Sequence, residues 1–228
     1  MQIIPEKLPF AAILFDMDGV IVDSEPLHER AFREVFQELG YGDHHGIEFH
    51  QYLGRSDRAL WDDFIIKHQP KQSLEFLSTL KQDRFLKIID DLKPIFSDLP
   101  ELVQRLARHY KLGLASGSLH PVIDAVLAMR NLRQFFPVRV SVQDVERSKP
   151  APDVFLRAAE LIGVSPSDCC VIEDSAAGVQ AGKSAGMTVI AITNTLPREA
   201  LSHADHVVSN YEEIDRLLLP ITRTLCRT

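Results

Sequence analysis

Short apolar runs and longer stretches of helical periodicity alternate along most of the chain. The run FAAILF, residues 10–15, is apolar at every position, which is typical of a parallel strand buried on both faces. We expect further strands at 112–116, 138–142, 169–172, 188–192 and 206–209. Strands that alternate with helices of ordinary length predict βαβ units and an α/β fold, with a doubly wound, mostly parallel sheet.

Three stretches between these runs carry apolar residues three or four positions apart. In residues 99–109 the side chains of Leu99, Leu102 and Leu106 share one helical face. Residues 121–129 and 152–162 show the same period. We expect these three stretches to be helices packed on the sheet.

The segment between the first two apolar runs has helical periods and no strand pattern. PLHERAFREVFQELG ends at Gly40, a typical helix stop, and two further helical patterns follow before Pro94. We therefore predict an all-helical cap, residues 23–94, inserted into a Rossmann-like core of residues 1–22 and 95–228. Such an insertion lies over the carboxyl ends of the strands, where these folds bind ligands. Asp23 and Ser24 are expected to cap its first helix.

Composition narrows the possible functions. The 228 residues are 45% hydrophobic, enough for a sizeable core, and the formal net charge of −7 argues against a nucleic-acid partner. No signal-peptide pattern is visible, and no run approaches the roughly 20 apolar residues that span a bilayer, so we expect a cytoplasmic protein. Adjacent Cys169 and Cys170 are expected to be buried, reduced thiols.

Polar residues follow the predicted strands at four places. Each alone has an ordinary explanation: a DxD pair suits a strand end, Ser118 is expected to cap the next helix, and lysines are usually solvated. The carboxyl ends of parallel strands, however, meet at one edge of a sheet. The residues brought there would be Asp16, Asp18, Ser116, Gly117, Lys149, Glu173 and Asp174.

Four of these residues are carboxylates, which repel one another. Two like charges ~4 Å apart repel by roughly 4 kcal/mol at an effective dielectric constant near 20. A divalent cation removes this cost, and ligands that are all oxygen favour Mg²⁺ over zinc. Lys149 and a serine hydroxyl beside the metal would complete a phosphate site. The sequence therefore predicts a Mg²⁺-dependent phosphate site at this edge.

The motifs FDMDGVIVDSE, ASGS, SKPAPDVF and VIEDSAAGVQAGKSAG occur in this order over nearly the whole chain. In this they resemble the haloacid dehalogenase superfamily, in its beta-phosphoglucomutase-like and sugar-phosphatase branch with a helical cap. The resemblance implies that Asp16 is the nucleophile and forms an aspartyl phosphate. It implies that Asp18 protonates the leaving oxygen and then activates water.

The resemblance also implies the ligands of the metal and of the phosphate. Mg²⁺ would be bound by the Asp16 side chain, the Asp18 carbonyl and Asp174, with Glu173 close by. Ser116, the Gly117 amide and Lys149 would hold the phosphoryl oxygens. Because the aspartate two positions after the nucleophile is kept, phosphate-ester chemistry is favoured over carbon–halogen or carbon–phosphorus cleavage.

Phosphatase and phosphomutase remain open from the sequence, and we favour the phosphatase. His28, Arg55 and Lys81 match substrate-binding positions in the cap of the mutase branch, although each could be an ordinary surface residue. The mutase has a lysine after the second serine of the second motif, where this chain has Leu119 and His120. The substrate is expected to be a sugar phosphate and the protein a monomer or weak dimer.

Two other classes fit less well. A phospho-receiver module also combines acidic residues, Mg²⁺ and a lysine on such a sheet, but it has about half this length and no cap. A member that only binds would not need a chemically competent residue at every motif position. His44, His45 and His50 lack metal-ligand spacing and are expected at the surface.

Overall fold

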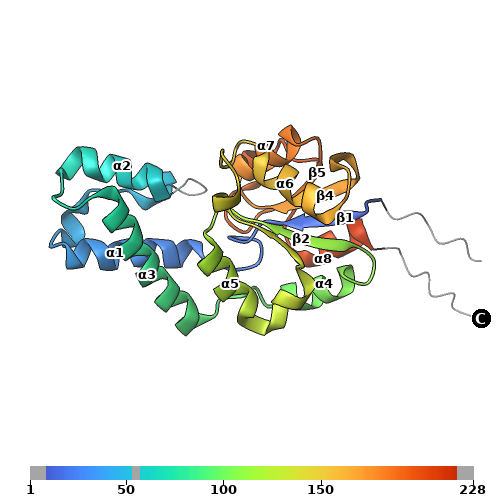
Figure 1. Cartoon of the computed structure of the whole chain (residues 1–228), viewed down its shortest axis with the longest axis horizontal. Coiled ribbons are helices and arrows are strands. Elements are labelled where there is room, and N and C mark those ends of the chain that lie inside the picture. The colour runs from blue at the N-terminus through green and yellow to red at the C-terminus, as the bar shows by residue number, and fades with distance from the viewer. Residues whose placement is uncertain (1–8, 53–56, 220–228) are drawn as a thin grey trace, which may run out of the picture.

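A computed structural model of the chain describes residues 9–52 and 57–219. Six parallel strands form one sheet in the order β3-β2-β1-β4-β5-β6 (Figure 1). Their bounds are β1 (Ala12–Phe15), β2 (Lys111–Ala115), β3 (Val138–Val140), β4 (Cys169–Glu173), β5 (Thr188–Ile192) and β6 (His206–Val208). All six strands expected from the apolar runs are therefore present, and the α/β fold with a parallel sheet is confirmed.

Helices cover both faces of the sheet, as a doubly wound fold requires. One face carries α6 (Asp153–Ile162) and α7 (Ala176–Ser184), and the other carries α4 (Leu99–Leu106), α5 (His120–Ala128) and α8 (Tyr211–Leu218) (Figure 1). The patterns at 99–109, 121–129 and 152–162 are confirmed as α4, α5 and α6. Helix α8 was not predicted, although its buried residues Tyr211, Ile214 and Leu218 have helical spacing.

The central strand β1 alternates between the two faces, which explains its unbroken apolar run. Ile13 and Phe15 belong to the core cluster on the α4–α5–α8 side, and Ala12 and Leu14 to the cluster under α6 and α7. All four side chains are fully buried. Residues 169–172 repeat this alternation, so Cys169 and Cys170 are buried free thiols as expected.

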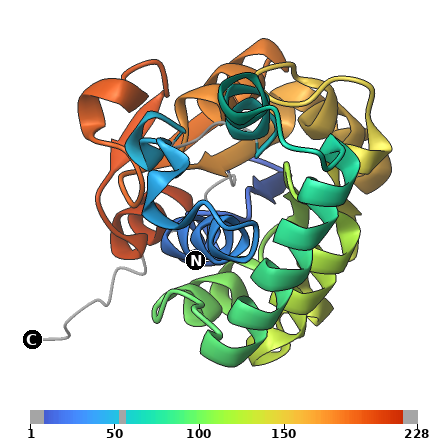
Figure 2. The same ribbon diagram turned by 90° about the vertical axis from the view of Figure 1, so that its left-hand side faces the viewer.

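The helical insertion consists of α1 (Glu25–Glu38), α2 (Asp57–His68) and α3 (Leu74–Leu92). It extends from one end of the sheet and has its own aromatic core (Figures 1 and 2). Phe36 is central to this core, with rings of Trp61 and Phe64 5.7 and 4.6 Å from its own. The buried members are Phe32, Val35, Phe36, Ile47, Leu60, Trp61, Phe64 and Leu77.

The expectation of a surface position is wrong for His45, although His44 and His50 are exposed. His45 is 5% exposed and stacks on Phe36, with ring centroids 4.8 Å apart. Its Nδ1 accepts a hydrogen bond of 3.0 Å from the backbone amide of Ile47. A histidine whose polar atoms find backbone partners can be part of an apolar core.

The chain enters and leaves the insertion along two adjacent backbone segments. The amide of Asp23 donates to the carbonyl of Pro94 at 2.9 Å, and Val22 forms an antiparallel bridge with Ile95. The two connecting segments thus lie side by side next to the loop that follows β1, and α1 and α3 also contribute buried residues to the core cluster that contains Phe15. Within the described ranges, no helix combines the length and apolar character needed to cross a bilayer.

Candidate active site

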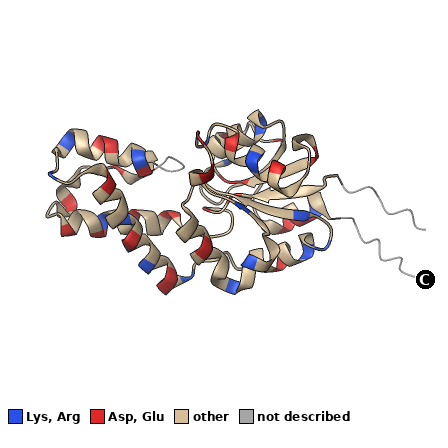
Figure 3. Ribbon diagram, in the orientation of Figure 1, with Lys and Arg blue, Asp and Glu red and all other residues tan. Residues whose placement is uncertain are grey.

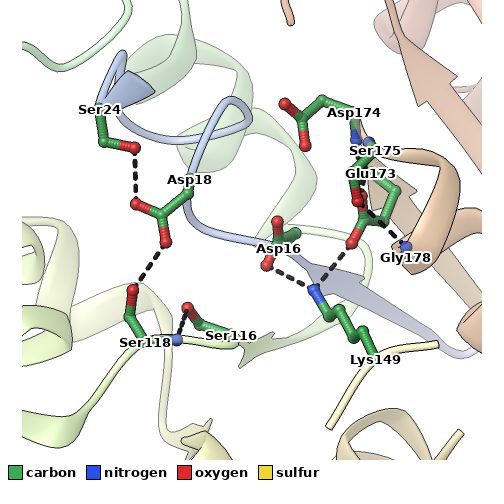
Figure 4. A network of polar contacts seen from close by, with 10 residues as sticks. All are labelled: Asp16, Asp18, Ser24, Ser116, Ser118, Lys149, Glu173, Asp174, Ser175 and Gly178. Atoms are coloured by element: carbon green, nitrogen blue, oxygen red, sulfur yellow. Dashed lines mark hydrogen bonds and ion pairs between the residues drawn. The ribbon is translucent and has the colours of Figure 1, made fainter. Parts of the chain in front are cut away.

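Strand register places Asp16 at the centre of the carboxyl edge. Phe15 pairs with Leu114 of β2 and Ile172 of β4, and the amide of Asp16 donates to the Ile172 carbonyl at 2.9 Å. The next residue therefore stands between the ends of the two neighbouring strands. Asp16 is 6% exposed, and its carboxylate points to Lys149 (Figure 4).

Lys149 joins two carboxylates that lie far apart in the sequence. Its Nζ is 2.6 Å from Oδ1 of Asp16 and 2.7 Å from Oε1 of Glu173. The lysine side chain is only 12% exposed, so Lys149 is not one of the solvated surface lysines. Such short contacts between charged groups in a buried position are among the stronger hydrogen bonds in proteins.

Glu173 is fully buried and uses both of its oxygens. While Oε1 accepts from Lys149, Oε2 accepts from the backbone amides of Asp174 and Ser175 and from the Ser175 hydroxyl, at 2.8–2.9 Å. The Ser175 hydroxyl also accepts from the Gly178 amide and caps α7. Glu173 thus fixes Lys149 and the turn that leads into α7.

Two glycines permit close approach to these carboxylates. Gly19 has φ of +72°, and a Cβ added there would lie 1.7 Å from Oδ2 of Asp174. A Cβ at Gly178 would lie 1.6 Å from Oε1 of Glu173. Any side chain at either position would collide with a carboxylate, so both glycines are needed for this arrangement.

The residues present fit a divalent cation. Asp16, Glu173 and Asp174 each offer a carboxylate oxygen, and these oxygens lie within 4.8 Å of one another. Lys149 supplies one positive charge against three negative ones, so the ionised group has a net charge of −2. Figure 4 shows Asp174 on the same side of the loop as Asp16. Oxygen ligands with excess negative charge are the set that Mg²⁺ prefers.

Burial and the crowding of carboxylates shift the pKa values in this cluster. Burial raises the pKa of Asp16 to about 7; the positive charge of Lys149 opposes this increase, and the Glu173 and Asp18 carboxylates add to it. Burial also raises the pKa of Asp174, and Glu173 and Asp16 add to the shift. Burial opposes the charge on Lys149, but Asp16 and Glu173 prevail and raise its pKa.

The side chain of Asp18 faces away from this cluster and accepts from three groups. Its oxygens receive the Ser24 hydroxyl at 2.6 Å and the Ser118 hydroxyl at 2.8 Å, and His28 Nε2 lies 3.7 Å away (Figure 4 shows both serines). Burial would raise the pKa of Asp18, but His28 and the two hydroxyls outweigh it and lower the pKa to about 2. Asp18 is therefore held in its ionised form.

These contacts correct two predicted helix caps. Leu119, not Ser118, occupies the N-cap of α5. Ser24 does stand at the N-cap of α1, but its side chain makes no capping bond, and Asp23 is exposed. Both serine hydroxyls donate to the Asp18 carboxylate, and a charged acceptor makes these hydrogen bonds strong. Sequence reasoning missed both as site residues, although their spacing from the DxD and ASGS motifs could have indicated them.

Ser116 and Gly117 follow β2, beside Asp16. Ser116 is fully buried, and its hydroxyl accepts from the amide of Ser118 at 3.0 Å. Gly117 is exposed at the same turn. The structure therefore places both residues at the edge where the sequence predicts them.

The helical insertion brings a second polar group to this edge. Lys81 of α3 is 2% exposed, and its Nζ lies 2.6 Å from Oδ2 of Asp57 and 2.5 Å from Nδ1 of His28. The interpretation of Lys81 as a solvated surface charge is therefore wrong. His28 stacks on Phe85, with centroids 4.1 Å apart. Arg55, the third residue predicted in the cap, lies outside the described residues. Asp57 was not predicted.

Comparison with known proteins decides the family. The family model described as "Haloacid dehalogenase-like hydrolase" matches residues 13–192. The chain belongs to this family. The matched residues include the helical insertion and the cluster around Asp16. The resemblance to the haloacid dehalogenase superfamily that the four motifs indicate is therefore confirmed.

Named relatives of this haloacid dehalogenase-like hydrolase include phosphatases and a phosphomutase. Fructose-1-phosphate phosphatase YqaB of Escherichia coli K12 is 32% identical over 79% of this chain and 95% of its own. Hexitol phosphatase B of the same organism is 33% identical over 79% and 82%. The crystal structure of beta-phosphoglucomutase from Clostridium difficile has a TM-score of 0.75 at 25% identity and covers 91% of this chain and 96% of its own.

Proposed function

We propose that the protein is a Mg²⁺-dependent phosphatase that hydrolyses a small phosphorylated metabolite through an aspartyl-phosphate intermediate. The observation that carries this proposal is the contact of the Lys149 ammonium with both Asp16 and Glu173, beside the carboxylate of Asp174. A buried carboxylate next to a cation at the end of a central strand is suited to attack phosphorus, because a phosphoryl dianion needs positive charge on its oxygens.

Asp16 would be the nucleophile. One of its oxygens bonds to phosphorus while the bond from phosphorus to the ester oxygen breaks. Lys149 holds the Asp16 carboxylate in place, and its ammonium can also donate a hydrogen bond to a phosphoryl oxygen when substrate binds. Ser116 and the Gly117 amide stand at the same edge and would bind the remaining phosphoryl oxygens.

Asp18 would move the protons. It gives a proton to the departing alcohol oxygen and later takes one from the water that attacks the aspartyl phosphate, releasing inorganic phosphate. Its contacts to Ser24, Ser118 and His28 favour the ionised form, which is the base. A bound phosphate dianion would raise its pKa by repulsion, so the acid form belongs to the substrate complex.

Asp16 and Asp174 would bind Mg²⁺ through their side chains, together with the Asp18 carbonyl. Glu173 would support both the metal site and Lys149, since both of its oxygens already accept hydrogen bonds. The cation, when bound, supplies positive charge that offsets the clustered carboxylates and the phosphoryl oxygens.

We further propose a sugar phosphate or sugar-alcohol phosphate as substrate, with residues 23–94 as the cap over it. The phosphatases that the chain resembles are named for fructose 1-phosphate and for hexitols. The similarity to beta-phosphoglucomutase favours a phosphomutase as the second candidate, because transfer and hydrolysis can share the same aspartyl phosphate.

Phosphate release distinguishes the two candidates. The purified protein is incubated with sugar phosphates, hexitol phosphates, phosphoglycolate, nucleotides and pyrophosphate, with Mg²⁺ and again with EDTA. We expect free phosphate from a sugar or hexitol phosphate, its loss with EDTA and its return when Mg²⁺ is added. Activity that survives EDTA would refute the metal assignment. Faster conversion of beta-glucose 1-phosphate to glucose 6-phosphate, with a bisphosphate primer, would establish the mutase.

A further inference from the structure

Asp57 places a negative charge beside the catalytic aspartate from the insertion side. It is the first residue of α2, and its side chain is 46% exposed. Its Oδ1 lies 3.8 Å from Nδ1 of His28, while Nε2 of the same ring lies 3.7 Å from Asp18. One imidazole ring therefore separates Asp57 from the carboxylate that would protonate the leaving oxygen.

This position is where the organic part of a substrate must lie. If the ester oxygen is held at Asp18, the carbon skeleton attached to it extends from Asp18 toward the insertion. A small sugar or sugar alcohol spans more than the width of one imidazole ring. The far end of such a substrate would therefore come within reach of the half-exposed Asp57.

Among the described residues, Asp57 also offsets the charge of Lys81, the cation of the insertion nearest to Asp18 that a second anionic group could meet. Lys81 has a side chain only 3% exposed, and Asp57 accepts from its Nζ at 2.6 Å. The ammonium is further enclosed by the rings of Phe32 and Phe85, each 4.9 Å from Nζ. Lys81 is thus already neutralised and shielded, and the group facing the solvent is a carboxylate.

We propose that Asp57 is a specificity-determining residue that selects phosphate esters with a neutral, hydroxyl-bearing far end and rejects those with a second anionic group. The carboxylate accepts hydrogen bonds from substrate hydroxyls and repels a carboxylate or second phosphate. This inference rests on the proposed phosphatase function, and it gives the substrate class of that same site.

A matched pair of substrates tests the proposal. D-glucitol 6-phosphate and 6-phospho-D-gluconate differ only at carbon 1, which carries a hydroxymethyl group in the first and a carboxylate in the second. We expect the wild-type protein to favour the glucitol ester in kcat/KM. In Asp57→Asn that preference should fall by about tenfold or more, since the like charge is removed and the positive charge of Lys81 is no longer offset by a carboxylate.

Two control variants separate the local charge from other effects. Asp57→Glu keeps the charge and should keep the preference within about threefold. Asp62→Asn removes an exposed carboxylate of the same helix that pairs with Arg58, and it should leave the preference unchanged. Because the readout is a ratio of two substrates, partial misfolding of any variant does not alter it.

The outcomes distinguish this inference from the function on which it rests. An equal preference in wild type and Asp57→Asn, or an equal fall in Asp62→Asn, overturns the role of Asp57 while leaving the phosphatase intact. Failure to hydrolyse any phosphate ester refutes the phosphatase itself. Where another ester is the better substrate, the same pair is measured as competing inhibitors of its hydrolysis, and the ratio of inhibition constants decides in the same way.

Discussion

The strand-end cluster and the helical insertion both bury a lysine against acidic residues, but they do so in different ways. Lys149 lies between Asp16 and Glu173, which follow or end adjacent parallel strands and so are fixed by the sheet. Lys81 lies among aromatic rings and reaches Asp57 and His28, which come from two other helices. In the first arrangement strand register sets the two carboxylates and the loop before α6 brings the lysine to them, whereas the second depends on how three helices pack.

The two regions are supported differently in the fold. The carboxylates at the strand ends need only the sheet to stay in place, so the proposed nucleophile Asp16 has a rigid support. Groups in the insertion depend on how its helices pack on one another, and α1 and α3 in turn pack into the core on the α4–α5–α8 side of the sheet. We infer that the strand-end cluster carries the reaction and the insertion adjusts which substrate is accepted.

Replacement of the central carboxylate gives the largest expected effect. Asp16→Asn keeps the shape of the side chain but removes the proposed nucleophile, so kcat for phosphate release should fall by on the order of 10⁴-fold or more. Steady-state phosphate release measures this, with far-UV circular dichroism to verify folding. Turnover within tenfold of the wild type would refute the assignment of Asp16.

Matched cavities in the two regions test whether they unfold separately. The single tryptophan, Trp61, is fully buried in the core of the insertion, so its fluorescence reports on that region. Phe64→Ala should destabilise the insertion by about 3–5 kcal/mol. We expect the fluorescence transition to occur at a lower urea concentration than the loss of hydrogen-exchange protection in β1.

Phe155→Ala is the matched control, since Phe155 of α6 is fully buried against the sheet. It should lower the protection of β1 by a similar free energy, ~3–5 kcal/mol, with a smaller effect on Trp61. If both probes shift together in both variants, the insertion and the sheet form one cooperative unit, and the separation drawn above is wrong.

The pH dependence of stability gives a smaller effect, confined to the strand-end cluster. The pKa of Asp16 is raised from 3.8 to about 7 on folding, so the folded protein binds more protons than the unfolded chain between these values. The stability that this group contributes is therefore present below pH ~4 and is lost as the pH rises to about 7. Asn resembles the protonated carboxyl and does not titrate.

In EDTA, Asp16→Asn should become more stable than the wild type as the pH rises through this window, by about 2–4 kcal/mol at pH 8. Thermal unfolding from pH 4 to 8 measures the difference. Saturating Mg²⁺ should reduce it, because the cation binds the ionised wild-type site better. A difference that does not change with pH would contradict the raised pKa of Asp16.

Much of the strand-end cluster was predictable because chain order and sheet register are tightly linked. Once the apolar runs are accepted as parallel strands, Asp16, Ser116 and Glu173 must fall at one edge. Lys149 lies in a loop, so the SKPAPDVF motif predicted only that it is near this edge. The structure shows which two carboxylates it contacts. The roles of Ser24 and Ser118 were missed because a serine before a helix is usually a cap, and here a charged acceptor lies within reach.

The side-chain contacts of the insertion were, in contrast, not predictable from the sequence. Its helical period predicted α1, α2 and α3, but periodicity does not say which polar residues on different helices meet. Asp57, His28 and Lys81 come together across three helices, and His45 is buried because a turn directs its ring onto Phe36. None of these contacts follows from spacing along the chain.

The amino-acid sequence by itself determined the parallel sheet, the inserted helices and the set of residues at the strand ends, because local periodicity and strand order settle these features. Only the tertiary structure decided that Asp18 is held by two serines and that Lys81 is buried against Asp57. These are contacts between side chains whose partners depend on packing distances of a few ångströms. Such distances arise when the whole chain folds, and no local pattern encodes them.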